Sequence, residues 1–148
     1  MIVQHVMSRD VRTVAPESTI REAARIMAEA DIGALPVAAG DRLAGMVTDR
    51  DIAIRAVAVG KGPDTTVGEV MTHDVLYCHE DEDVSHISEN MADMQVRRLP
   101  VVDVDKRLVG IVSLADIALG ADTEEAGEAL EGITRPGGDR SQSIDGRA

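Results

Sequence analysis

The stretch that decides the fold is Gly45–Ala53, which reads GMVTDRDIA and returns later in the chain as Gly110–Ala118, GIVSLADIA. Two further matches precede it in the same order: Val6–Val11 (VMSRDV) returns as Val70–Val75 (VMTHDV), and Leu35–Val37 (LPV) returns as Leu99–Val101. Three ordered matches at a nearly constant spacing indicate a duplicated folding unit that is longer than a solenoid repeat. Two copies imply a pseudo-twofold axis, and a cleft where the copies meet is a natural place for a ligand.

Length and composition favour a small acidic globular protein. The chain has 148 residues, so each copy alone would bury only about 60% of its unfolded surface, and the two copies are expected to share a core. Apolar residues make up 44% of the chain, but there is no Phe or Trp, and Tyr77 is the one tyrosine. Aromatic platforms for stacked bases are therefore lacking. The net charge of −12 repels phosphate backbones, so neither nucleic acid nor an anionic membrane surface is an expected partner.

The sequence also bears on the cellular compartment. A single cysteine cannot form an intrachain disulfide, which suits a reducing compartment. We find neither a basic-then-apolar leader at the N-terminus nor an apolar run approaching the length of a membrane span. A soluble, cytoplasmic protein is expected.

Both copies predict the element order β-α-β-β-α, which makes the fold class α/β, with a three-stranded sheet covered by helices in each copy. The expected strands are Arg12–Val14, Leu35–Ala38 and Leu43–Val47 in the first copy, and Val75–Cys78, Leu99–Val104 and Leu108–Val112 in the second. Thr19 and Asp83 are the expected N-caps of the first helix in each copy. The last helix is expected to start at Thr48 or Ser113.

These elements give domain limits of 1–60 for the first repeat, 61–69 for a linker and 70–120 for the second repeat. Thr66–Met71 is expected to form a short turn of helix, with a counterpart around Ile2–Met7. Residues 121–148 form an acidic to polar C-terminal tail that is expected to be disordered.

The pattern Gly-apolar-apolar-Thr/Ser-x-x-Asp, placed after Leu-Pro-Val, resembles the CBS domain, which is named from cystathionine β-synthase. The resemblance covers about residues 1–120, includes both members of a tandem pair, and is strongest to small stand-alone bacterial proteins such as the hypoxic-response type. It implies two pseudo-symmetric repeats packed through their sheets. It also implies adenosine-containing ligands (AMP, ADP or ATP, in some members S-adenosylmethionine or NAD) in two clefts, a homodimer of pairs, and an effector protein that the module regulates.

The repeated motif has a physical rationale for such a ligand. Thr48 and Ser113 stand where a strand meets a helix N-terminus, where backbone N–H groups and the helix dipole favour an anion such as phosphate. Asp51 and Asp116 follow in the first helical turn and can accept hydrogen bonds from two ribose hydroxyls.

The resemblance further implies that each cleft combines the helix start of one copy with residues of the other. Thr48 and Asp51 would then face Leu76, Arg97 and Pro100, whereas Ser113 and Asp116 would face Thr13, Gly33, Ala34 and Pro36. Arg97 and Arg98 precede Leu99 where Gly33 and Ala34 precede Leu35, so we expect the two clefts to be unequal. Arg50 is a third candidate for phosphate.

Each of these assignments has a simpler alternative. Thr/Ser-x-x-Asp at a helix start is also a capping box, and a helix end that caps itself when empty can still receive a phosphate. Arg97 and Arg98 can be a solvated basic pair on an acidic surface, and Arg50 an ordinary surface residue.

Other chemistry finds little support in the sequence. His73, Cys78, His79 and His86 lack the spacing of a zinc site, so no metal is expected. No nucleophile elbow, phosphate-binding loop or dinucleotide fingerprint is present, so an enzyme is not expected. The leading hypothesis is an adenine-nucleotide sensor that acts on a partner by conformational change, and the alternative is a structural or interaction protein that binds no nucleotide.

Overall fold

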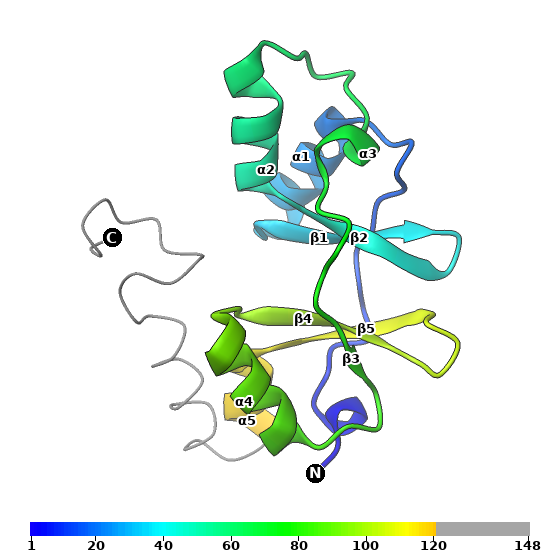
Figure 1. Cartoon of the computed structure of the whole chain (residues 1–148), viewed down its shortest axis with the longest axis vertical. Coiled ribbons are helices and arrows are strands. Elements are labelled where there is room, and N and C mark those ends of the chain that lie inside the picture. Colours follow the sequence, from blue (N-terminus) through cyan, green and yellow to red (C-terminus); the bar gives the residue numbers. More distant parts are fainter. Residues whose placement is uncertain (121–148) are drawn as a thin grey trace, which may run out of the picture. The chain divides into compact units, whose positions relative to one another are not determined.

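The computed structural model describes residues 1–120, and Figure 1 shows its elements. They divide into two compact units. The first-copy unit consists of Asp10–Leu76 together with the short segment Asp105–Leu108. The second-copy unit consists of Met1–Arg9, Tyr77–Val104 and the described residues from Val109 on. The tail expected at 121–148 lies outside the described residues.

The first-copy unit contains a two-stranded antiparallel sheet and its covering helices. Its elements, in chain order, are α1 (Ile20–Ala30), β1 (Ala34–Ala39), β2 (Arg42–Thr48), α2 (Asp49–Arg55), the 3-10 helix η2 (Val57–Val59) and α3 (Val67–Val70). Helices α1 and α2 lie on the same side of the β1–β2 hairpin (Figure 1). The core between them is aliphatic and includes Leu35, Val37, Val47 and Val67, all fully buried.

The second-copy unit has a three-stranded sheet, and its leading helical turn comes first in the chain, whereas α3 comes last in the first-copy unit. Its elements are the 3-10 helix η1 (Val3–His5), β3 (Cys78–His79), α4 (Val84–Met94), β4 (Arg98–Val102), β5 (Leu108–Ser113) and α5 (Leu114–Gly120). The sheet order is β3-β4-β5, and β3 runs parallel to β4. Helices α4 and α5 lie on one side of it (Figure 1). The α/β class and the helix starts are confirmed: Thr19 accepts a hydrogen bond from the Glu22 amide, and Asp83 accepts one from the Ser85 amide.

The predicted strand at Arg12–Val14 is wrong, because the structure has only one bridge there, between Val14 and Val37. The physical reason is Pro16, which has no N–H group. The matching residue of the second copy is Glu80. Its amide donates to the Val102 carbonyl (3.1 Å) and so extends the pairing of β3 with β4. The expected strand at Val75–Cys78 is likewise shorter and shifted, to Cys78–His79.

The helical turns η1 and α3 each come before one copy in the sequence but pack against the other copy. In the first-copy unit the Gly68 amide of α3 donates to the Pro16 carbonyl (2.9 Å), and Thr72 bridges Met46 of β2. In the second-copy unit the Gln4 amide of η1 donates to Glu80, and Ser8 bridges Ile111 of β5. The expected correspondence between Thr66–Met71 and Ile2–Met7 is confirmed, and the compact units therefore do not share their bounds with the sequence copies.

Cys78 of β3 is buried in the core of the second-copy unit. Burial, with the negative charge of Glu82 as a second cause, raises the pKa of its thiol from 9.0 to about 12. Below pH 9 the thiol is protonated in the folded and the unfolded chain, so it contributes no pH dependence. Between these two pKa values only the unfolded chain releases the proton, and the free energy of unfolding should fall by about 1.4 kcal/mol per pH unit.

The Cys78→Val substitution, which copies Val14 of the first repeat, should remove this contribution. Urea unfolding of both proteins from about pH 8 to about pH 10.5 measures the two slopes. Equal slopes would show that the thiol is not protected as its burial implies.

Candidate functional site

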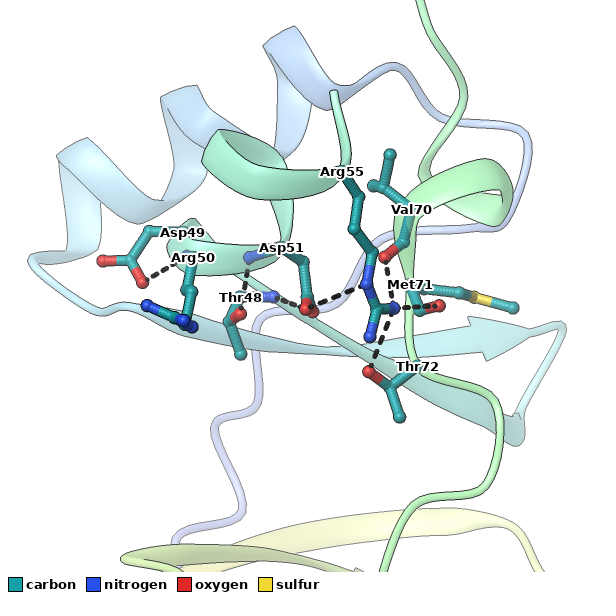
Figure 2. Close-up of polar contacts among 8 residues, drawn as sticks. All are labelled: Thr48, Asp49, Arg50, Asp51, Arg55, Val70, Met71 and Thr72. Atoms are coloured by element: carbon teal, nitrogen blue, oxygen red, sulfur yellow. Dashed lines mark hydrogen bonds and ion pairs between the residues drawn. The ribbon is translucent and has the colours of Figure 1, made fainter. Parts of the chain in front are cut away.

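Helix α2 begins with a reciprocal capping box formed by Thr48 and Asp51. The Asp51 amide donates to Thr48 Oγ1 (3.0 Å), and the Thr48 amide donates to Asp51 Oδ2 (3.0 Å), as Figure 2 shows. Thr48 ends β2 with an extended backbone, and Asp51 lies in the first turn of α2. The carboxylate and hydroxyl expected to contact a ligand therefore also satisfy two backbone N–H groups at the helix start.

The second copy repeats this arrangement at the start of α5. The Ser113 amide donates to Asp116 Oδ2 (2.9 Å), and the Asp116 amide donates to Ser113 Oγ (3.2 Å). Aspartate has a shorter side chain than the glutamate usual at this position, yet it closes the box in both copies. The capping alternative is thus present at both helix starts. The four side chains are half-buried, so a ligand can still reach them.

The residue two positions before each Leu-Pro lies at the helix start of its own copy. The Gly33 carbonyl accepts a hydrogen bond from the Asp49 amide (3.0 Å), and the Arg97 carbonyl accepts one from the Leu114 amide (3.1 Å). Each of these carbonyls satisfies one N–H group of the first helical turn. The structure therefore brings Gly33 next to Thr48 and Asp51, and Arg97 next to Ser113 and Asp116.

The two helix starts differ in the residue that follows the hydroxyl-bearing residue. Asp49 follows Thr48, and its Oδ1 accepts a hydrogen bond from the Arg50 amide (2.8 Å). The matching position after Ser113 is Leu114, an aliphatic residue. An acidic side chain that accepts from a first-turn N–H group competes with an incoming phosphate, and no acidic side chain stands at the matching position of α5. The sequence placed the expected difference between the two clefts at Arg97, and Asp49 was not recognised as a second difference.

The remaining candidates are distributed over both units. Thr13, Ala34, Pro36, Arg50 and Leu76 lie in the first-copy unit, and Arg98 and Pro100 lie in the second-copy unit. Pro36 of β1 and Pro100 of β4 are buried, Ala34 is half-buried, and the others are exposed. Whether Thr48 and Asp51 share a ligand with Arg97 and Pro100, and Ser113 and Asp116 with Thr13 and Pro36, stays a prediction.

Arg55, at the end of α2, was missed by the sequence analysis. Its Nη1 donates to the carbonyl oxygens of Val70 (3.0 Å) and Met71 (3.1 Å), and its Nε lies 3.9 Å from Asp51 Oδ1 (Figure 2). The only sequence signal was the spacing of four residues from Asp51 to Arg55, which places the two on one helix face.

Residues 1–120 contain neither a cluster of metal ligands nor a helix that could span a membrane. No group of three or more His, Cys, Asp or Glu side chains in this range is arranged to hold a metal ion. No helix in the same range has the length and hydropathy needed to span a membrane.

Comparison with known proteins agrees with the duplicated architecture. A family model for the CBS domain matches twice, at residues 3–57 and 67–120. The CBS domain-containing protein YhcV of Bacillus subtilis is 43% identical over 133 residues, which cover 89% of this chain and 94% of YhcV.

Solved structures of proteins with different bound ligands are also similar to this chain. Hypoxic Response Protein I with two coordinated zinc ions has a TM-score of 0.75 and 40% identity, over 82% of this chain and 100% of that one. The CBS domain pair of protein MJ0100, in complex with 5′-methylthioadenosine and S-adenosyl-L-methionine, has a TM-score of 0.69 and 35% identity, over 80% and 94%. CBSX2 in complex with AMP has a TM-score of 0.72 and 25% identity, over 80% and 93%. The chain belongs to the CBS domain family, as a tandem pair of these domains.

Proposed function

We propose that the protein is a regulatory module that binds an adenine nucleotide or a related adenosine compound at the starts of α2 and α5. The observation that carries the proposal is the pair of Thr/Ser-Asp capping boxes, each built identically at a strand-to-helix junction. The complexes of MJ0100 with two adenosine compounds and of CBSX2 with AMP support this ligand class.

The capping boxes explain how such a site can exist both empty and occupied. Each box uses Oδ2 of its aspartate to accept a backbone N–H, which leaves lone pairs on the carboxylate for ribose hydroxyls. A carboxylate already held by the backbone loses little conformational entropy when a ligand binds. Ligand binding would then favour one arrangement of the protein, by no more than the difference in its affinity for the two arrangements.

The two helix starts should prefer different ligands. At α5 the residue after Ser113 is Leu114, which carries no charge to compete for the first-turn amides, so this start suits a phosphate group. At α2 the carboxylate of Asp49 lies beside the first-turn amides and disfavours a second negative charge. This start suits an adenosine compound without a phosphate, such as 5′-methylthioadenosine.

Thermal unfolding in the presence of AMP, ADP, ATP, 5′-methylthioadenosine and S-adenosylmethionine tests the proposal. Binding to the folded state raises Tm in proportion to the logarithm of ligand concentration over Kd. A rise in Tm with at least one of these compounds is expected. No rise with any of them at millimolar concentration would favour the alternative, a structural or interaction protein that binds no nucleotide, and turnover of a nucleotide would point to an enzyme.

The proposal includes a homodimer, through the apolar surface at the end of the first repeat. Ile54, Val57 and Val59 of α2 and η2 are 52%, 67% and 63% exposed. Several large aliphatic side chains exposed together favour contact with another protein surface. Replacing one of these aliphatic residues with a charged residue should therefore dissociate the dimer.

Val57→Glu should convert the dimer to a monomer in sedimentation or light-scattering measurements, because a desolvated carboxylate without a partner is costly at an interface. Val104→Glu is the matched control, since Val104 is 91% exposed and lies in the other unit. The dimer surface is elsewhere if both variants behave like the wild-type protein.

A further inference from the structure

Arg55 connects the helix that carries Asp51 with the chain that leaves the first-copy unit. Its Nη1 donates to the carbonyls of Val70 and Met71 and lies 3.4 Å from the Thr72 hydroxyl, while its Nε faces Asp51 (Figure 2). The carbonyls of Val70 and Met71 end the short helix α3, where no further helical N–H is available to them. A single guanidinium thus satisfies the end of α3 and faces the carboxylate at the start of α2.

The same segment, Val70–Thr72, is also fixed from the opposite direction by β2. The Thr72 amide donates to the Met46 carbonyl (2.8 Å), and the Met46 amide donates to the Thr72 carbonyl (3.0 Å). Gly45 allows this approach, because a Cβ atom there would collide with the Thr72 carbonyl oxygen. The segment Val70–Thr72 is therefore held between Arg55 and β2, just before the chain passes through Leu76 to the second-copy unit.

The second copy achieves the corresponding contact without an arginine. Gly120 stands at the position of Arg55, and the Cβ atom it lacks would lie 2.7 Å from Cγ1 of Val6, the counterpart of Val70. There the backbone of α5 approaches the leading segment directly. The link through a side chain is consequently a feature of the first copy alone, within the described residues.

We propose that Arg55 is a positioning residue of the first-copy site, which holds the Asp51 carboxylate and fastens the segment Val70–Thr72 to the same helix, so that a ligand at Asp51 stiffens this segment. The inference rests on the proposed function, because it takes Asp51 as a ligand contact. Such coupling is reciprocal. If ligand binding favours the fastened state of the segment Val70–Thr72 by some factor, fastening the segment must raise the affinity for the ligand by the same factor.

The first test measures binding by calorimetry, with AMP and 5′-methylthioadenosine, in two backgrounds that each retain one site. In the Asp116→Ala background, where the first-copy site remains, Arg55→Met should weaken binding about fivefold, which corresponds to one hydrogen-bonded contact. In the Asp51→Ala background the same substitution should leave the second-copy site within about twofold. Arg55→Lys, which keeps the charge, should recover part of the loss.

Arg25→Met is the matched control, because Arg25 is an exposed arginine of α1 in the same unit. It should leave both sites unchanged. Equal weakening of both sites by Arg55→Met would indicate a general loss of structure and would overturn the inference, and so would the absence of any effect in the Asp116→Ala background.

The second test needs no ligand and separates a failure of the inference from a failure of the proposed function. Asp51→Asn keeps an oxygen for the capping box but removes the charge that faces Arg55. It should speed hydrogen exchange of the Thr72 amide about twofold, which is the size of the effect of an ion pair on one helix face. It should have no such effect in Arg55→Met protein.

If wild-type protein binds no adenosine compound, the proposed function fails, and the role of Arg55 as part of a ligand site fails with it. If it binds and Asp51→Asn acts equally with and without Arg55, only the inference is wrong.

Discussion

Gly45→Ala should lower the free energy of unfolding by about 2 to 3 kcal/mol, in the range measured for overpacked interiors. A Cβ atom at Gly45 would overlap the Thr72 carbonyl oxygen and lie 3.3 Å from the carbonyl carbon, and both atoms belong to backbone. This backbone cannot move away cheaply, because Thr72 and Met46 exchange two hydrogen bonds at the same place. Urea unfolding followed by circular dichroism measures the change.

Gly110→Ala tests the same contact in the second-copy unit. Its Cβ atom would lie 2.6 Å from Sδ of Met7 and 2.9 Å from the Ser8 carbonyl oxygen. The methionine side chain can move, so this loss should be smaller than that at Gly45. Gly62→Ala is the control for both, because a Cβ atom there meets nothing within 4 Å, and no left-handed backbone requires glycine at that position. If Gly45→Ala is as stable as Gly62→Ala, the segment Val70–Thr72 does not dock on β2 as described.

Local features of the fold were predictable because they depend on residues close together in the sequence. Thr19 and Asp83 cap α1 and α4 as expected, since an N-cap interacts with amides only two or three positions ahead. The repeated motif fixed the element order in the same way. The extent of the strand at Arg12–Val14 was not predictable from its own residues, because it depends on an N–H that Pro16 lacks and on a partner strand more than twenty residues away.

In the candidate site, too, the contacts between neighbours in the sequence could be predicted, and the long-range contacts could not. The contacts of Thr48 with Asp51, and of Ser113 with Asp116, follow from a spacing of three residues at a helix start. The contacts of Arg55 do not follow from local spacing, because Val70 and Met71 are brought to it by the docking of α3. Asp49 was not among the predicted site residues, because its position is not one of the two that the repeated Thr/Ser-x-x-Asp motif requires.

Asp51→Ala and Asp116→Ala should each weaken adenosine-ligand binding at the substituted site about thirtyfold. A carboxylate that accepts hydrogen bonds from ribose hydroxyls makes charge-assisted hydrogen bonds, which are about twice as strong as neutral ones. Because Asp49 competes with a phosphate at the start of α2 and Leu114 does not at the start of α5, Asp116→Ala should mainly affect AMP, and Asp51→Ala should mainly affect 5′-methylthioadenosine. Calorimetric titration of each variant with both compounds measures these changes.

Loss of the capping box is a separate effect of these substitutions, and Glu69→Ala controls for it. Glu69 closes the capping box of α3 by accepting from the Thr66 amide (3.3 Å), and it belongs to neither proposed site. Its removal should cost about 1 kcal/mol of stability and leave the affinity of the second-copy site unchanged. At the first-copy site it should weaken binding no more than Arg55→Met does, because α3 ends in the segment Val70–Thr72 that Arg55 fastens. If Glu69→Ala weakens binding as strongly as Asp51→Ala, the aspartates act through helix stability and not through the ligand.

The most direct measurement is the titration of the double variant Asp51→Ala/Asp116→Ala with AMP and 5′-methylthioadenosine, on protein whose thermal unfolding shows that it is folded at the temperature used. The expectation is that wild-type protein releases or absorbs heat with at least one of the two compounds and that the double variant gives only the heat of dilution. Binding by the double variant with wild-type affinity and stoichiometry would contradict it.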